Sequence, residues 1–533
     1  MKRLLACFFG VALMVPTASG QSDLGAQTRQ QLKPTTGVVS NTIREAEAAG
    51  DSLWVGPSLT VYVEDENRFL APEDPTVRGR LKDSQNSVLS LAAGGESSSV
   101  VWAGLAFSAA GGALGAAGFL VSTDGGQSFE SRPVHLDEPS DTTITYGVST
   151  LSAVPVTRED TSAPQDLALG RTADTVWVAG RRSGLRWSAD QGRTWNRAVL
   201  PPDTFQVVRP TNEYNFRVGP GGRPGLLNYF VYSVLVDETG TVWAGTAAGV
   251  NWSTPADVGP DGDRTWRRFG AEGTPRGLPG QRVQALAEQP RPGKRNPIWM
   301  TAARLSRTQR SGLAVTPDGG DTFRAALLGK QVNDLAARPE RVYAAAASGL
   351  YVSGDQGRTW RSIEDFRLQA EDEVLPTDST FAVESTPSAL WVGTDEGLLR
   401  LDRADEPRLL PDDPGATLPA WQLFRTDIPV NPENPTERVP DVETYAYPNP
   451  FVPSRDQVVR IVYEVPEPQT VEVNIYDFSM NRVRTLREQE SAGRQEISWD
   501  GTGEGGLRLP TGTYLYTVEL GGATVRGKIV LSN

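Results

Sequence analysis

Cysteine and histidine are nearly absent from this chain of 533 residues, which contains one of each. The cysteine, Cys7, lies in an apolar leader, so the chain without that leader has no disulfide, no thiolate metal ligand and no cysteine nucleophile. A serine–histidine–acid arrangement would have to use His135, and histidine-rich metal sites are excluded. We therefore predict no metal site and no cofactor, and we assign no catalytic residue.

Long apolar runs are also few. Residues 4–15 are apolar, follow two basic residues and precede small residues at 18–20, which predicts a secretory signal peptide over 1–20. A lipoprotein cut before Cys7 would leave no room for an apolar segment. Residues 103–121 carry no charge over nearly the length of a membrane helix, yet they begin and end on repeated strand motifs. We expect a long loop there and no membrane segment in the mature chain.

Positive charge is in deficit as well, because the net charge is −13 at pH 7. An acidic protein binds nucleic acid and anionic membranes poorly, so we expect neither as a partner. The length exceeds that of one ordinary domain, which predicts two.

A repeated turn motif organises the chain. Residues 348–360 read SGLYVSGDQGRTW, and residues 183–195 are identical to them at ten of thirteen positions. Two or three apolar residues in alternation predict a strand, and S-x-D-x-G-x-T-W predicts a tight turn in which the aspartate accepts backbone N–H groups. The pattern resembles the Asp-box (BNR) repeat of sialidases and other secreted β-propellers, and this resemblance implies a structural turn remote from any active site. The predicted structural aspartates are Asp124, Asp190, Asp263, Asp318 and Asp355.

A second motif recurs in step with the turns. It is a short strand with an aromatic residue followed by small residues, and it occurs seven times, at Trp54, Trp102, Trp177, Trp243, Trp299, Tyr343 and Trp391. Another apolar alternation precedes each occurrence and a Gly-Leu type strand follows it. Four short strands in each of seven units predict a seven-bladed β-propeller. In the last unit we expect residues 405–419 to replace the turn, and Trp421 to take the role of Trp360.

Composition divides the chain further. We predict a lead segment over 21–40, the propeller over 41–425 and a proline-rich linker over 426–444. Residues 445–533 form an Ig-like C-terminal domain, in which six strand candidates predict a small antiparallel sandwich. The fold class is therefore all-β, a seven-bladed β-propeller followed by a small Ig-like β-sandwich.

Long loops between the second and third strands and between blades would form the usual binding face of a propeller. Two of them, over 201–228 and 302–311, mix arginines with aromatic residues, which stack on sugars or peptides and pair with carboxylates. We predict that one mouth of the central channel is lined by Tyr214, Arg217, Arg304, Arg307 and Arg310. Solvated loop arginines are the alternative.

A sialidase or other glycoside hydrolase is the enzymatic alternative. Sialidases grip a substrate carboxylate with three arginines, have six blades and commonly carry an Arg-Ile-Pro motif near the N-terminus, which is absent here. Two-carboxylate chemistry has no local motif in its favour. Resemblance to propeller assembly factors of photosystem II depends on the Asp-boxes alone.

The C-terminal segment carries a more specific resemblance. The motifs YPNPF (447–451), VEVNIYD (471–477), WDG (499–501), LPTGTY (509–514) and KIVL (528–531) follow one another in order. They are similar to the Ig-like domain of the flagellar hook-capping family and to the C-terminal sorting domain of the type IX secretion system. Residues 478–481 depart from that pattern, since the family usually has a glycine after the asparagine. A plain Ig-like spacer is the alternative.

These features together predict a noncatalytic binding propeller. The resemblance implies export through the periplasm to the outer cell surface or the medium, with the outer-membrane secretion machinery as the partner of 445–533. The partner of the propeller would be an extracellular glycan or protein. The sequence names neither this ligand nor the oligomeric state.

Overall fold

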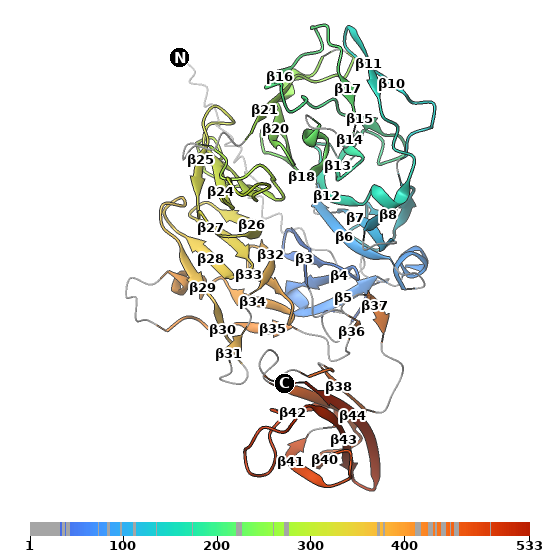
Figure 1. The fold of residues 1–533 in the computed structure, drawn as a ribbon, viewed down its shortest axis with the longest axis vertical. Coiled ribbons are helices and arrows are strands. Elements are labelled where there is room, and N and C mark those ends of the chain that lie inside the picture. The colour runs from blue at the N-terminus through green and yellow to red at the C-terminus, as the bar shows by residue number, and fades with distance from the viewer. Residues whose placement is uncertain are drawn as a thin grey trace, which may run out of the picture.

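The computed structural model describes residues 32–34, 38 and 43–532, except 73, 83–85, 96–98, 110–112, 135, 173, 220–225, 260, 271–276, 370–373, 377–378, 411–416, 425–429, 432–433, 439–443, 448, 452, 454–457 and 491. The predicted signal peptide, His135 and most of the predicted linker lie outside the described residues. A ring of sheets and a smaller β-domain make up the molecule (Figure 1).

Seven antiparallel sheets form the ring, and in each of them the first strand lies innermost. The first two blades are β2 (Ala46–Ala49), β3 (Ser52–Val55), β4 (Thr60–Val63), β5 (Arg68–Pro72) and then β6 (Ser87–Gly94), β7 (Val100–Ser108), β8 (Leu114–Ser122), β9 (Glu130–Arg132). The next two are β12 (Pro164–Leu169), β13 (Val176–Gly180), β14 (Gly184–Ser188), β15 (Asn196–Arg197) and then β18 (Val231–Val236), β19 (Val242–Thr246), β20 (Gly249–Ser253), β21 (Trp266–Phe269). The fifth and sixth are β22 (Leu286–Glu288), β23 (Ile298–Ala302), β24 (Gly312–Thr316), β25 (Arg324–Ala326) and then β26 (Val332–Arg338), β27 (Arg341–Ala346), β28 (Gly349–Ser353), β29 (Arg361–Ile363). The last is β32 (Thr380–Ser385), β33 (Ala389–Thr394), β34 (Leu398–Asp402), β35 (Gln422–Phe424).

Further short elements decorate the blades. Strand β1 (Leu32–Pro34) pairs with β5, and β16 (Val207–Val208) pairs with β21. Small sheets are formed by β10 (Thr143–Tyr146), β11 (Ser149–Ala153) and β17 (Arg217–Val218), by β30 (Asp365–Arg367) and β31 (Val374–Pro376), and by β36 (Val430–Asn431) and β37 (Asn434–Arg438). The short helices are η1 (Glu64–Glu66), α1 (Pro75–Val77), η2 (Arg78–Lys82), η5 (Glu159–Thr161), η6 (Leu227–Tyr229), η7 (Pro255–Asp257) and η8 (Glu406–Leu409).

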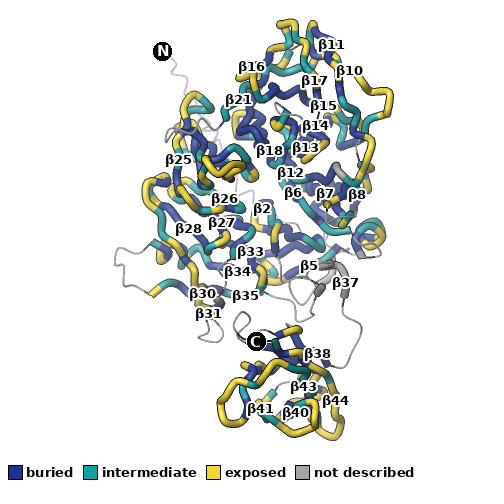
Figure 2. The backbone as a smooth tube through the Cα atoms, viewed as in Figure 1, coloured by how far each residue is buried: buried dark blue, intermediate teal, exposed yellow. Residues whose placement is uncertain are grey.

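Aromatic residues join neighbouring blades. The aromatic residue of each second strand is at most 2% exposed. At four junctions the aromatic residue that closes the next blade's turn packs against it, in the pairs Trp54–Phe129, Trp102–Trp195, Trp177–Trp266 and Trp299–Trp360. In the sixth blade Trp360 meets Trp299 of the fifth at 6.1 Å between ring centroids. Gly357 (φ 73°) lies between them, and a Cβ there would stand 2.4 Å from the Trp299 ring, so only glycine fits. Figure 2 shows the resulting pattern, with buried strands and exposed turns.

The last blade meets the first without a break. Arg400 on β34 pairs with Glu64 at 2.5 Å, and the Tyr62 and Trp391 rings lie 4.7 Å apart. The backbone N–H of Ile43 donates to the carbonyl oxygen of Thr394 at 2.9 Å. As expected, Trp421 is buried directly before β35.

The region expected to be a long loop near residues 103–121 is mostly strand. The β7–β8 pairing continues from Val101–Ser122 to Ser108–Leu114, because alternating small and apolar residues allow the hairpin to extend. No helix in the described part of the chain is long and apolar enough to span a bilayer.

The C-terminal domain is a sandwich of two sheets. One contains β38 (Thr444–Tyr447), β39 (Val459–Val465) and β42 (Gly493–Trp499). The other contains β41 (Arg482–Glu490), β40 (Gln469–Tyr476), β43 (Gly512–Leu520) and β44 (Ala523–Leu531). Six strands were expected, and β38 is the addition. In the β40–β41 turn Met480 takes the position that favours glycine (φ 65°).

Candidate functional site in the central channel

Carboxylates on the innermost strands hold neighbouring blades together. Asp166 on β12 accepts a hydrogen bond from the Val234 N–H of the next blade at 2.8 Å, and Asp334 on β26 accepts one from Val383 at 2.9 Å. Glu45, directly before β2, accepts one from Leu91 at 2.8 Å. The strand pairing shifts register just before Asp166 and Asp334, and this irregularity turns the side chain toward the next blade.

Burial makes these carboxyl groups hold their protons. Burial raises the pKa of Asp166 to about 7 and that of Asp334 to about 6, although backbone N–H groups partly counter it. Burial also raises the pKa of Glu45 well above its usual range. Asp166 and Asp334 therefore titrate near neutrality instead of near pH 4.

Two further carboxyl groups form a pair where the ring closes. Glu47 on β2 and Glu384 on β32 belong to the first and last blades. Burial raises the pKa of Glu384 to about 7. Burial and then the charge of Glu384 raise the pKa of Glu47 well above its usual range. At neutral pH the pair retains at least part of one proton.

The channel encloses a cavity of about 370 Å³ between the first strands of six blades and the start of β2. Besides the carboxyl groups, Gln165, Gln284 and Asn333 line it. Arg44 also lines it, with its guanidinium 5.0 Å from the centre of the Phe381 ring. Such a lining suits a neutral or cationic polar group. Within the described residues no three histidine, cysteine or acidic side chains are placed to hold a metal ion.

The repeated turns have a structural arrangement of hydrogen bonds. Asp355 accepts from the Ser353 hydroxyl at 2.9 Å, and from the Thr359 amide and hydroxyl at 2.9 and 2.7 Å. Partial burial would raise the pKa of Asp355, but these hydrogen bonds outweigh it and hold the pKa at about 2. The corresponding bonds also form at Asp124, Asp190 and Asp318.

Asp263 is the exception among the five predicted aspartates. Its carboxylate accepts from the Gly147 N–H at 2.7 Å, in the turn between β10 and β11. The insertion before it supplies a substitute, since Asp257 accepts from the Thr254 amide at 2.8 Å and pairs with Arg267 at 2.6 Å. The prediction that Asp263 closes its own turn is therefore corrected.

The five predicted ligand-binding residues do not line the central cavity. Tyr214 packs against Phe205 and Phe216, at 5.9 and 5.5 Å between ring centroids, and Arg217 lies in β17, which pairs with β11. Arg304, Arg307 and Arg310 are exposed between β23 and β24 of the fifth blade. Figure 1 shows β17 at the outer edge of the ring, away from β24. The two loops therefore do not line one mouth of the channel together, as had been predicted. Loop length alone did not indicate that the first loop would join a peripheral sheet.

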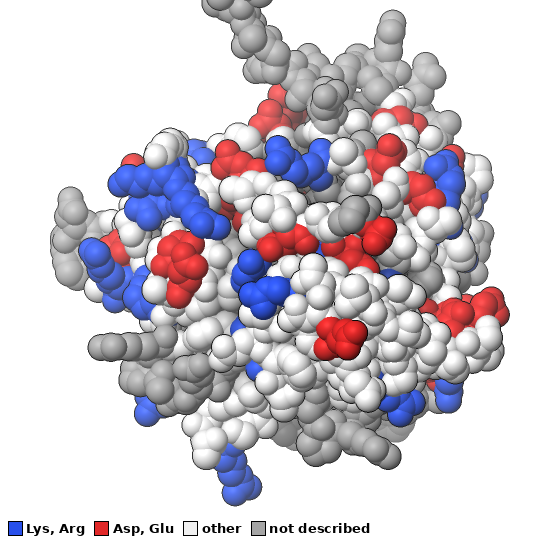
Figure 3. Space-filling model, turned by 90° about the horizontal axis from the view of Figure 1, so that it is seen from above, with Lys and Arg blue, Asp and Glu red and all other residues white. Residues whose placement is uncertain are grey.

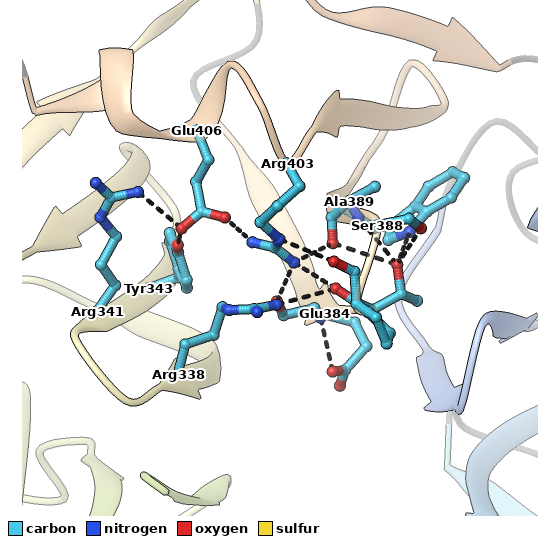
Figure 4. Close-up of polar contacts among 12 residues, drawn as sticks. Arg338, Arg341, Tyr343, Glu384, Ser388, Ala389, Arg403 and Glu406 are labelled. Atoms are coloured by element: carbon cyan, nitrogen blue, oxygen red, sulfur yellow. Dashed lines mark hydrogen bonds and ion pairs between the residues drawn. The ribbon is translucent and has the colours of Figure 1, made fainter. Parts of the chain in front are cut away.

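A polar cluster replaces the repeated turn in the last blade (Figure 4). Glu406 in η8 pairs with Arg341 at 2.8 Å, and it also contacts Arg403 and the Tyr343 hydroxyl. Arg403 donates to the Ala389 carbonyl at 2.9 Å. Burial and then the charge of Arg338 lower the pKa of Arg403 to about 10. The cluster ties the sixth blade to the seventh.

Sequence reasoning missed the channel carboxylates. The signal was present, because an acidic residue lies next to the apolar part of two innermost strands, which read PQDLAL (164–169) and VNDLAAR (332–338). A charged residue in such a strand indicates a partner across the blade boundary.

Comparison with known proteins supports the two-part architecture. Residues 454–523 match the family model of the FlgD Ig-like domain. The crystal structure of the GH74 xyloglucanase from Xanthomonas campestris aligns with 94% of this chain and 74% of its own, at 13% identity and a TM-score of 0.50. PorZ, described as an essential surface component of the type-IX secretion system of Porphyromonas gingivalis, aligns with 92% of this chain and 81% of its own, at 13% identity and a TM-score of 0.31. Comparison with curated protein sequences gave no match. By its sheets the chain is a seven-bladed β-propeller followed by an Ig-like sandwich, and residues 454–523 of that sandwich are similar to the FlgD Ig-like domain.

Proposed function

We propose that this chain is a noncatalytic binding protein whose propeller recognises an extracellular glycan or protein. The observation that carries this proposal is the arrangement of the channel carboxylates. Three of them accept backbone N–H groups of the next blade. A glycoside hydrolase needs one carboxyl group free to protonate the leaving oxygen and a second free to act as base or nucleophile. Carboxylates occupied as blade connectors favour binding over catalysis.

Glycan and peptide arrays test this proposal with the purified full chain. We expect capture of a defined ligand group and recovery of that ligand unchanged. Release of a shortened glycan by the wild-type chain would contradict the noncatalytic role.

We further propose that the C-terminal domain delivers the propeller across the outer membrane after Sec export. The match to the FlgD Ig-like domain supports a folded module at this position, and the ordered motifs from 447 to 531 resemble sorting domains. In a host with type IX machinery, removal of residues 444–533 should leave the propeller in the periplasm. Normal export of the truncated chain would make the domain a plain spacer.

One observation favours the hydrolase alternative. Glu47 and Glu384 form a carboxyl pair in an open cavity, and burial raises the pKa of Glu384 to about 7, which is a frequent property of catalytic acids. If the pair is catalytic, Glu384→Gln should remove polysaccharide cleavage. If it is structural, no cleavage is present to lose.

A further inference from the structure

A second pocket, of about 170 Å³, lies between the fifth and sixth blades on the side of the repeated turns. This side is opposite to the loops between second and third strands, where the binding face was expected. Three arginines from separate segments share its lining with apolar residues: Arg291, Arg324, Arg358, Trp299, Pro297 and Pro317. Three arginines around one small pocket are unusual in a chain whose net charge is −13. Figure 3 shows one face of the molecule, where basic and acidic side chains form small groups.

Arg324 is fixed in the pocket by its neighbours. It donates to the Gln356 carbonyl at 2.6 Å, and its guanidinium lies 5.9 Å from the centre of the Trp299 ring. The backbones beside the other two arginines are also held, since the N–H groups of Arg291 and Arg358 donate to Asn296 and Asp355 at 2.6 and 3.0 Å. The Arg324 guanidinium is therefore positioned before any ligand arrives, and the other two arginines extend from a held backbone.

The pocket contains positive charge that no acidic side chain offsets by an ion pair. None of the three arginines has an ion-pair partner among the described residues. Burial and then the positive charge of Arg358 lower the pKa of Arg324, and the charge of Asp355 counters them only in part. An anion in the pocket would counter them further.

The repeat provides an internal comparison. The turn DQGRTW occurs in both the third and the sixth blades, so Arg193 corresponds to Arg358. Each of these turns faces the fourth strand of the blade before it. That strand begins at Glu130 in the second blade and at Arg324 in the fifth. Glu130 pairs with Arg132 at 2.5 Å, and its pKa is lowered by that contact and by the charge of Arg193. The junction between the second and third blades thus has an acidic side chain at this position. The junction between the fifth and sixth blades has a third arginine instead.

We propose that the pocket between the fifth and sixth blades binds an oxyanion, namely a carboxylate, sulfate or phosphate group carried by the ligand of the propeller. Guanidinium groups recognise these anions through paired, charge-assisted hydrogen bonds. The apolar wall of Pro297 and Pro317 would contact the body of the ligand. This inference rests on the proposed function, because it names the charged group of the molecule that the propeller binds.

Calorimetric titration of the full chain with sulfate, phosphate and glucuronate at low ionic strength tests the proposal. We expect one site, binding that weakens as sodium chloride is added, and affinity about tenfold lower in Arg358→Gln and in Arg291→Gln. Arg193→Gln is the matched control, since it removes the same charge from the same turn sequence in another blade, and it should bind as the wild type does. Tighter binding of glucuronate would indicate a carboxylate ligand, and tighter binding of sulfate or phosphate an ester or inorganic anion.

Arg324→Glu places the residue of the earlier junction in the pocket and should abolish anion binding. Because this variant also loses the Gln356 contact, its thermal unfolding is compared with that of the wild type. The exposed Arg358 keeps the test decisive if Arg324→Glu does not fold. No anion binding, or equal binding by wild type and Arg358→Gln, would overturn the proposal. Capture of a neutral glycan on the arrays would then still support the proposed function, so the two failures are distinguishable.

Discussion

The free energy of unfolding of Asp166→Asn, measured as its difference from that of the wild type, should be higher at pH 8 than at pH 5. Burial raises the pKa of Asp166 from 3.8 to about 7, which corresponds to about 4 kcal/mol between the charged and neutral forms. The side chain is half-buried at the edge of an open channel, so we expect solvent to reduce this to about 2 kcal/mol. The folded state keeps its proton up to about pH 7, while the unfolded chain loses it near pH 4. The stabilisation is therefore complete below pH 4 and is lost as the pH rises through 7.

Urea unfolding followed by tryptophan fluorescence at pH 5 and pH 8 measures this effect. The amide cannot accept both hydrogen bonds made by the carboxylate. The amide does not titrate, so the pH dependence of the difference between variant and wild type comes from the Asp166 carboxyl group alone, and its pKa already includes the effect of these hydrogen bonds. Asp365→Asn is the control, because Asp365 is exposed on β30, and this variant should keep the same difference between pH 5 and pH 8 as the wild type. An identical pH difference in the wild type and Asp166→Asn would refute the reasoning.

Three other perturbations test separate parts of the account. Asp355→Ala should lower the free energy of unfolding by about 1 kcal/mol through lost turn hydrogen bonds. Urea unfolding should show the same loss from pH 5 to 8 and a smaller one toward pH 2, where the wild-type carboxylate becomes protonated. Ligand affinity in the folded fraction, measured by array binding, should stay unchanged. Glu406→Gln should cost about 3 kcal/mol, because it leaves Arg341 and Arg403 without their shared buried partner, whereas Asp405→Asn, which breaks an exposed pair with Arg408, should cost well under 1 kcal/mol in the same assay. Deleting residues 444–533 should leave the cooperative unfolding of the propeller unchanged by circular dichroism, since the domain has its own core around Trp499.

The blades could be predicted from the sequence because each carries its own local signal. Turn aspartates such as Asp190 and Asp355 bond mainly to residues two to four positions away, so a short motif contains nearly the whole interaction. The second-strand aromatic residues are similarly local. Seven repeats of the strand signal, with the turn motif in five of the units, were sufficient for the fold.

Features that depend on distant segments could not be predicted in this way. Asp263 bonds to Gly147, which lies 116 positions earlier, and the short strand containing Arg217 pairs with β11 rather than with a blade. The pocket between the fifth and sixth blades requires Arg291 and Arg358 to meet across a blade boundary. Loop composition carries no information about such pairings, which is why the predicted site and the observed pockets differ.

The most direct test of the noncatalytic role is mass spectrometry of array-identified glycans after prolonged incubation with the full chain. We predict that the bound glycan is recovered at its original mass in full yield, with wild type and Glu384→Gln giving the same result. Shorter products from the wild type, absent with Glu384→Gln, would contradict the account and identify the propeller as a hydrolase.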